Sequence, residues 1–329
     1  KVKPVPSMKI IITLFFTSII LPLCGQTLAY TAPSGYVKSN LVVGFNPIGI
    51  NLHGDILVSG IIDSEDANVV TDADVDFTTT LTDADATYLL EISNGAQNGA
   101  VAVITASTAT TITIEGSGIA AGAASYAVRQ AKTLNEVFGT GASATLTGSF
   151  NSTGSDIVWV PDGAGDYDRY YYNANFNEFR STENQFSSPP KPIAFFYPDG
   201  AFVEVKSSPK TITLFGEVKK TGTIIAATAG FSIFTVPSPA GQTLDELGLK
   251  DDLTQSFSSA AADVFWVPDG AGGYVRYFVH IAGGGTWRST TSQFFGNEGG
   301  TVVTGAISIE RKSASTSALA ELPAFFSTL

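Results

Sequence analysis

The stretch DIVWVPDGAGDYDRYYY at 156–172 recurs as DVFWVPDGAGGYVRYFV at 263–279, with 11 of the 17 positions identical. In both, an apolar run leads into Pro-Asp-Gly, which favours a turn, and an aromatic run follows. This order predicts two antiparallel strands joined by a tight turn. The similarity extends from Thr133-Leu134-Asn135-Glu136 and Thr243-Leu244-Asp245-Glu246 through Glu204–Ser207 and Glu310–Ser313. The chain therefore contains a duplicated domain, since a solenoid would need at least three stacked units.

Strand signals also fill the segment before the first copy. Two runs rich in apolar residues, at 88–93 and 100–106, flank Asn94–Gly99, whose asparagine and glycine residues suit a hairpin loop. With 33 glycines in the chain, this pattern favours an all-β protein with few short helices. Short helical turns are expected at 133–138, 243–253 and 315–322, the first two opening with a Thr-x-x-Glu capping box.

We expect an N-terminal β-meander domain followed by two homologous modules of β-sandwich or barrel-like architecture. The boundaries predicted from the sequence are 1–29 for an over-extended start plus a cleaved signal peptide, 30–130 for the N-terminal β domain, 131–222 for copy 1 and 223–329 for copy 2. A further similarity relates Gly230–Ile233 to Gly44–Ile48, but by itself it is too short to extend the repeat.

The N-terminus has the pattern of a secretory signal. Met8 and Lys9 precede an apolar run from 10 to 23, which is shorter than a membrane span, and Thr27-Leu28-Ala29 suits signal peptidase. We expect an extracytoplasmic protein, secreted, periplasmic or at the cell surface, with no transmembrane span in its mature form. Lipidation of Cys24 is the alternative, although Leu23 stands where a lipobox has a small residue.

The charge of the chain argues against a nucleic-acid partner. The formal net charge is −12, with 30 acidic residues against 18 basic ones. Phosphate recognition draws on clustered lysine and arginine, which this sequence lacks. Cleavage before Tyr30 would also remove the only cysteine, so the mature protein would have no disulfide.

An acidic segment contains the only metal candidates. Carboxylates at alternate positions suit calcium, and Asp83 falls eleven residues after Asp72, where a calcium loop has its bidentate ligand. Phe77, however, occupies the place of the loop's required glycine. The calcium candidates are thus Asp72, Asp74, Asp76 and Asp83, and a solvated acidic segment is the alternative. No other cofactor is expected.

Catalytic signatures are missing from the sequence. His53 and His280 are the only histidines, and neither belongs to a recognisable Ser-His-Asp or zinc motif. The distance between the paired carboxylates of a glycosidase is set by the fold, so this kind of active site stays an open alternative.

Aromatic residues suggest the best binding surface. Trp287, with Arg288 beside it and Arg180 in the other copy, is the predicted ligand-binding group, because tryptophan combines apolar area with a hydrogen-bond donor. Trp287 is expected to be exposed next to Gly283-Gly284-Gly285. Trp159 and Trp266 are expected in the core, since they recur in equivalent strands.

The predicted signal peptide, the segments 88–99 and 133–139, and Trp287-Arg288 resemble an uncharacterised family of Gly-rich exported proteins that occurs as paralogues in verrucomicrobial-type bacteria. The resemblance covers most of the mature chain, and Phe179-Arg180 departs from the Trp-Arg form. The family has no assigned activity, so the resemblance implies none.

These observations predict a non-enzymatic, extracytoplasmic structural or surface-interaction protein. Its partner would be a cell-surface polymer, a glycan or a second copy of the chain. Carbohydrate binding, with or without the assistance of calcium, is the alternative function, and a secreted hydrolase with paired carboxylates is a third.

Overall fold

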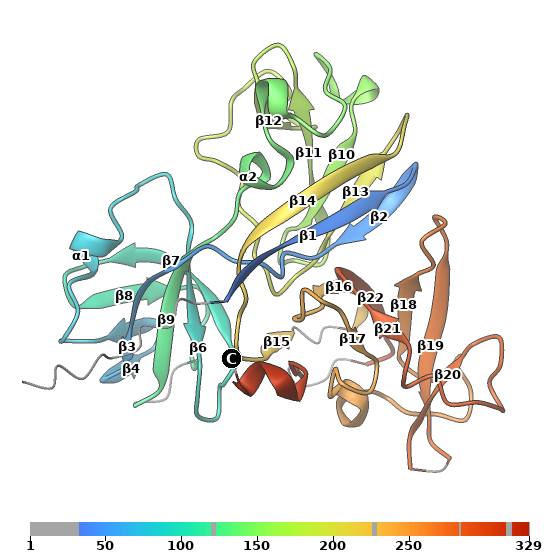
Figure 1. Ribbon diagram of the computed structural model, residues 1–329. Coiled ribbons are helices and arrows are strands. Elements are labelled where there is room, and N and C mark those ends of the chain that lie inside the picture. The colour runs from blue at the N-terminus through green and yellow to red at the C-terminus, as the bar shows by residue number, and fades with distance from the viewer. Residues whose placement is uncertain (1–32, 120–122, 226–228, 283, 314–317, 329) are drawn as a thin grey trace, which may run out of the picture. The chain divides into compact units, whose positions relative to one another are not determined.

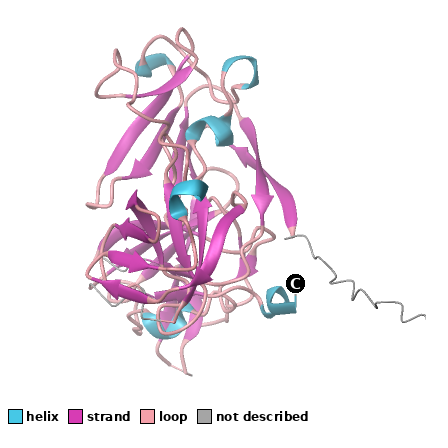
Figure 2. Cartoon of the chain, turned by 90° about the vertical axis from the view of Figure 1, so that its left-hand side faces the viewer, coloured by secondary structure: helices cyan, strands magenta, loops and turns pink. Residues whose placement is uncertain are grey.

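The computed structural model describes residues 33–119, 123–225, 229–282, 284–313 and 318–328 (Figure 1). The residues of the expected signal peptide, with Cys24, lie outside these ranges. Strands make up 42% of the described residues and helices 8%, so the predicted all-β class is confirmed. Figure 2 shows how few segments are helical. No helix in the described part of the chain is long and apolar enough to cross a bilayer.

Copy 1 is built on a five-stranded antiparallel sheet in the order β12-β11-β10-β13-β2. Its strands are β2 (Gly44–Ile48), β10 (Ile157–Pro161), β11 (Tyr167–Asn173), β12 (Glu178–Ser181) and β13 (Ala201–Val205). A two-stranded ribbon of β1 (Ser34–Leu41) and β14 (Lys210–Glu217) accompanies this sheet (Figure 1). The quoted 156–172 stretch forms the predicted hairpin, with Trp159 opposite Arg169.

Copy 2 repeats this topology. Its sheet has the order β20-β19-β18-β22-β16, and β15 and β23 form the accompanying ribbon. The strands are β15 (Thr223–Ile225), β16 (Gly230–Thr235), β18 (Val264–Pro268), β19 (Tyr274–His280), β20 (Thr286–Ser289), β22 (Ala306–Arg311) and β23 (Ala318–Ala320). A short pair, β17 (Gln242–Thr243) with β21 (Val302–Val303), corresponds to the bridge between Thr133 and Ala194 in copy 1.

The pairing shows that β2 and β16 are equivalent first strands. Phe45 lies opposite Glu204, and Phe231 lies opposite Glu310, which explains the short Gly-Phe similarity seen in the sequence. Strands β1 and β2 precede the expected boundary at residue 130, yet they pair with strands of copy 1. A second sheet is therefore inserted within copy 1, between β2 and β10.

The inserted sheet has seven strands in the order β3-β9-β6-β7-β8-β5-β4. They are β3 (Ile56–Ile61), β4 (Ser64–Asp66), β5 (Val69–Thr71), β6 (Tyr88–Ile92), β7 (Val101–Ser107), β8 (Thr111–Ile114) and β9 (Ser125–Gln130). The hairpin expected at 88–106 is present as β6 and β7. The sheet is only partly a meander, because β9 returns to lie between β3 and β6.

Helices are short. They are α1 (Phe77–Thr80) and α2 (Leu134–Phe138), with 3₁₀ turns at Gly141–Ser143, Ser152–Gly154, Leu249–Asp252 and Ala324–Thr328. The capping box predicted before α2 is formed by Thr133 and Glu136. The prediction of a helical turn at 315–322 is wrong for the part of this range that the structure describes, because Ala318–Ala320 pairs with β15 as a strand.

Each copy buries its own core between the inner face of its sheet and the segments that cover it. In copy 1, Val158 and Tyr172 of the sheet belong to one cluster with Leu214 of the ribbon and Phe138 of α2. Copy 2 repeats this arrangement, and the inserted sheet has a separate cluster around Phe77. Apolar burial of this kind is the main favourable term in folding.

Buried charges join the inserted sheet to copy 1. The Arg129 guanidinium on β9 lies 3.1 Å from Glu91 of β6 and 2.6 Å from Glu217 of β14. Lys219 and His53 are buried near this group, and burial lowers the pKa of Lys219 to about 8. Burial, together with the Lys219 charge, lowers the pKa of His53 well below its ordinary value. The junction thus depends on pairing of its charges.

Candidate functional site

Three of the four aspartates proposed for calcium, Asp72, Asp76 and Asp83, use their carboxylates for contacts within the chain. Asp72 is buried, and its carboxylate accepts hydrogen bonds from the Tyr126 hydroxyl at 2.7 Å and from the Asp74 N–H at 2.9 Å. Asp76 caps α1, and Asp83 accepts a hydrogen bond from the Asp85 N–H. Within the described ranges, no three His, Cys, Asp or Glu side chains are placed to hold a metal. The structure therefore does not bring the four candidates together as a ligand set.

Trp287 lies in the core of copy 2. Its exposed fraction is 0%, and its ring centroid is 4.9 Å from that of Phe265. The expected exposure of Trp287 is wrong because β20 alternates, and this position faces the inner side of the sheet. Trp159 and Trp266, in contrast, lie half-buried on the outer faces, where Arg169 and Arg276 cover their rings at 5.4 and 5.0 Å.

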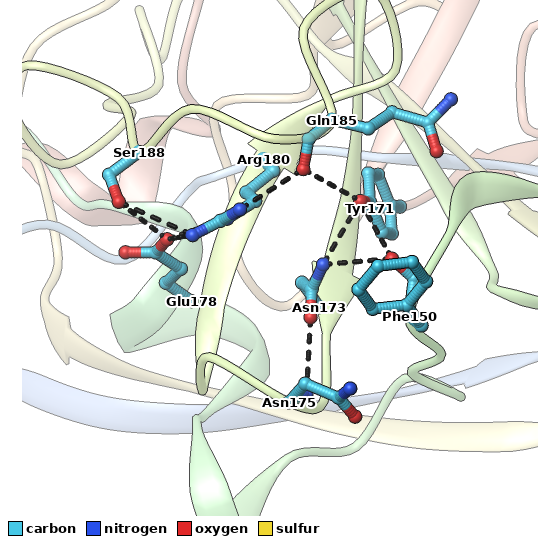
Figure 3. A network of polar contacts seen from close by, with 8 residues as sticks. All are labelled: Phe150, Tyr171, Asn173, Asn175, Glu178, Arg180, Gln185 and Ser188. Carbon is cyan, nitrogen blue, oxygen red and sulfur yellow. Dashed lines mark hydrogen bonds and ion pairs between the residues drawn. The ribbon is translucent and has the colours of Figure 1, made fainter.

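Arg180 is the centre of a polar network at one end of copy 1 (Figure 3). Its side chain is buried; Nε donates to Glu178 Oε1 at 2.6 Å, and Nη1 donates to the Gln185 carbonyl at 3.1 Å. On the neighbouring strand, the Tyr171 hydroxyl and Asn173 Nδ2 lie at 3.3 and 2.9 Å from the Phe150 carbonyl oxygen. The network holds the loops around 150 and 185 against β11 and β12.

Copy 2 repeats this arrangement with Arg288. Its Nη1 donates to the Gln293 carbonyl at 2.7 Å, as Arg180 does to Gln185. The two glutamine side chains are also equivalent, because Gln185 Oε1 accepts from the Ser152 N–H and Gln293 Oε1 accepts from the Ser259 N–H. Arg180 and Arg288 therefore position loops through backbone contacts.

These loops carry exposed phenylalanines at equivalent positions of the two copies. We call them the aromatic tips: Phe150 and Phe186 in copy 1, and Phe257, Phe294 and Phe295 in copy 2. The rings of Phe150 and Phe186 are 48% and 77% exposed with centroids 6.0 Å apart. The three rings of copy 2 are 66%, 72% and 79% exposed. Our sequence reasoning missed the tips, although the repeat register places phenylalanine at 150 and 257, and at 186 and 294.

A cavity of about 610 Å³ lies between the inserted sheet and copy 1. Its walls are largely apolar, and the polar side chains that line it include Thr87, Glu115, Asp168, Tyr170 and Ser181. The Tyr170 hydroxyl donates to Asp168 at 3.3 Å, and burial, followed by the Asp168 charge, raises the pKa of Tyr170 to about 12. Volume and lining are typical of a small-molecule site.

The two histidines occupy unrelated places. His53 belongs to the buried charge junction, and His280 packs against Phe257 with ring centroids 5.4 Å apart.

Comparison of the chain with protein-family models, with curated proteins and with solved structures finds no match.

Proposed function

We propose that this is a non-enzymatic, extracytoplasmic surface-interaction protein that makes contact through its two aromatic tips. The partner would be a polymer of the cell surface or a second copy of the chain. The expected signal peptide supports export, and the net charge of −12 favours solubility of the exported chain. The observation that carries the proposal is the repetition of exposed phenylalanines on loops held by the same Arg–Gln contacts.

Exposure of these phenylalanine rings to water costs free energy unless a partner buries them. Burial of apolar surface is worth roughly 25 cal/mol per Å². Contiguous exposed apolar patches on soluble proteins commonly mark interaction sites. The loops that carry the aromatic tips are also held in position. Arg180 and Arg288 each donate a hydrogen bond to a loop carbonyl, and this limits the loop motion that would otherwise oppose binding.

The test compares the purified wild type with the double variant Phe186→Ser/Phe294→Ser. Phe215→Ser is the matched control, because Phe215 is 62% exposed but lies on β14 and belongs to neither aromatic tip. Co-sedimentation with cells of the source organism and sedimentation velocity of the protein alone measure the two classes of partner. We expect wild type and control to associate in at least one assay and the double variant to lose at least about tenfold in affinity, since two rings are removed. A wild type that associates in neither assay would refute the proposal.

Carbohydrate binding is a second candidate, favoured by the cavity beside the inserted sheet. Asp168 and Tyr170 are partners in the cavity wall, and carboxylate and hydroxyl groups of this kind can bind sugar hydroxyls. A glycan array that compares wild type with Asp168→Asn tests this candidate function. Equal binding by both proteins would exclude the cavity as the carbohydrate-binding site. The hydrolase alternative would need Glu115 and Asp168 as its carboxylate pair and stays a prediction.

A further inference from the structure

Two equivalent grooves lie between copy 1 and copy 2. Each is lined by the Pro-Asp-Gly turn of one copy and the first sheet strand of the other. The first, which we call the acidic groove, has a volume of about 370 Å³ and combines the turn of copy 1 with β16. The second groove, of about 340 Å³, combines the turn of copy 2 with β1 and β2.

Backbone contacts between the copies fix the walls of the acidic groove. The Thr235 N–H donates to the Pro198 carbonyl at 3.0 Å, and the Gly200 N–H donates to the Ile233 carbonyl at 3.2 Å. The turn that forms the opposite wall is closed by the Asp162 carboxylate, which accepts hydrogen bonds from the N–H groups of Ala164 and Asp166. A ligand would therefore meet a largely preformed site.

The aromatic lining of the two grooves is equivalent. Tyr167 and Phe231 line the acidic groove, and Tyr274 and Phe45 line the second groove. Phe231 and Phe45 are 48% and 47% exposed, so they offer the same apolar area to a ligand.

The charge of the two grooves differs. Asp166 and Asp199 line the acidic groove, and no lysine or arginine is among its described lining residues. Lys38 lines the second groove, whose described lining contains no acidic residue. The position of Asp199, five residues before Glu204 in β13, is taken by Gly305, five residues before Glu310 in β22.

The acidic groove contains a carboxylate, that of Asp199, that is unpaired among the described residues. It makes no hydrogen bond or ion pair with any described residue, although its backbone carbonyl accepts a hydrogen bond from the Thr235 hydroxyl. Asp199 is half-buried, and burial raises its pKa to about 6, so the group is ionised at neutral pH while it is partly removed from water. An unpaired, half-buried carboxylate costs free energy, which an ammonium ion in the groove would offset.

We infer that the acidic groove binds a primary ammonium group carried on an apolar or sugar-ring body. The Asp199 carboxylate would pair with the ammonium, and the rings of Tyr167 and Phe231 would contact the cation and the body attached to it. An amino sugar and a lysine side chain share this chemistry. The second groove lacks the carboxylate and would not bind such a ligand. This inference is independent of the aromatic tips.

Titration of the full chain, monitored by NMR and calorimetry at pH 7.5 and low salt, tests the inference. Glucosamine is compared with N-acetylglucosamine, and Nα-acetyl-lysine methylamide with its Nζ-acetylated form. We expect binding of at least one ammonium ligand and none of its acetylated analogue. The tighter of the two ammonium ligands identifies the source.

Variants separate the acidic groove from the second one. Asp199→Asn and Phe231→Ala should each weaken ammonium binding roughly tenfold or more, and Phe45→Ala, the equivalent change in the second groove, should leave it unchanged. Circular dichroism confirms that each variant is folded. Acetylated analogues that bind as well as the amines, unchanged binding by folded Asp199→Asn, or no binding of either amine would each overturn the inference.

Discussion

Replacement of Asp199 by asparagine should stabilise the protein at neutral pH. Asparagine keeps the size of the side chain and removes the charge that burial disfavours. Asp199 has its pKa raised from an ordinary value of 3.8 to about 6, and burial is the cause. A carboxyl group with a raised pKa in the folded state favours folding while it is protonated and opposes folding once it is ionised.

The size of the effect follows from that shift. A difference of about two pKa units, at 1.36 kcal/mol per unit, corresponds to roughly 3 kcal/mol. At pH 3.5 and below the group is mostly protonated in both states, so most of the charge penalty is missing there. The penalty develops as the pH rises from about 4 to about 6 and is complete above that range. The gain from Asp199→Asn should therefore be about 3 kcal/mol larger at pH 7.5 than at pH 3.5.

Urea unfolding of wild type and variant at several pH values, read by tryptophan fluorescence, measures this difference. Asp66→Asn, the same replacement at an exposed carboxyl on β4, is the control. A stability difference between wild type and Asp199→Asn that does not change from pH 3.5 to pH 7.5 would refute the reasoning, because it would mean that the carboxylate stays solvated when ionised.

Two further replacements test the buried parts of the molecule. Arg129→Met should lower the free energy of unfolding by roughly 3 to 5 kcal/mol in urea unfolding, because Glu91 and Glu217 would stay buried without their partner. The control Arg169→Met, at a side chain that is 43% exposed, should cost less than about 1 kcal/mol, and equal effects of the two changes would contradict the assignment. Trp287→Ala should cost roughly 3 to 5 kcal/mol by calorimetry, as expected for a cavity in a core. A cost below about 1 kcal/mol would show that Trp287 is not packed.

Local signals in the sequence were sufficient for the all-β class and for the repeated hairpin. The Pro-Asp-Gly turn and the capping box at Thr133 depend on residues a few positions apart, so a single sequence shows them. The same is true of the β6–β7 hairpin. These elements are all present in the structure.

Long-range pairing was not visible in the same way. The Gly-Phe similarity at 44–45 and 230–231 was noticed, but its meaning depends on β2 pairing with β13, which no local pattern encodes. The orientation of Trp287 was misjudged for a related reason. Neighbouring glycines suggested exposure, whereas the side-chain alternation of β20 within its sheet decides which way the ring points.

The insertion within copy 1 has a consequence for how the chain acquires its fold. Asn46 of β2 contacts Val203 of β13 across a separation of 157 residues, whereas copy 2 is continuous from Thr223 to Ala320. Contacts between distant parts of a chain close large loops and slow folding. Copy 2 is thus expected to form rapidly as a unit. Copy 1 has the higher contact order. Its first strands, β1 and β2, therefore have unpaired edges during folding until the inserted sheet and the rest of the copy have formed.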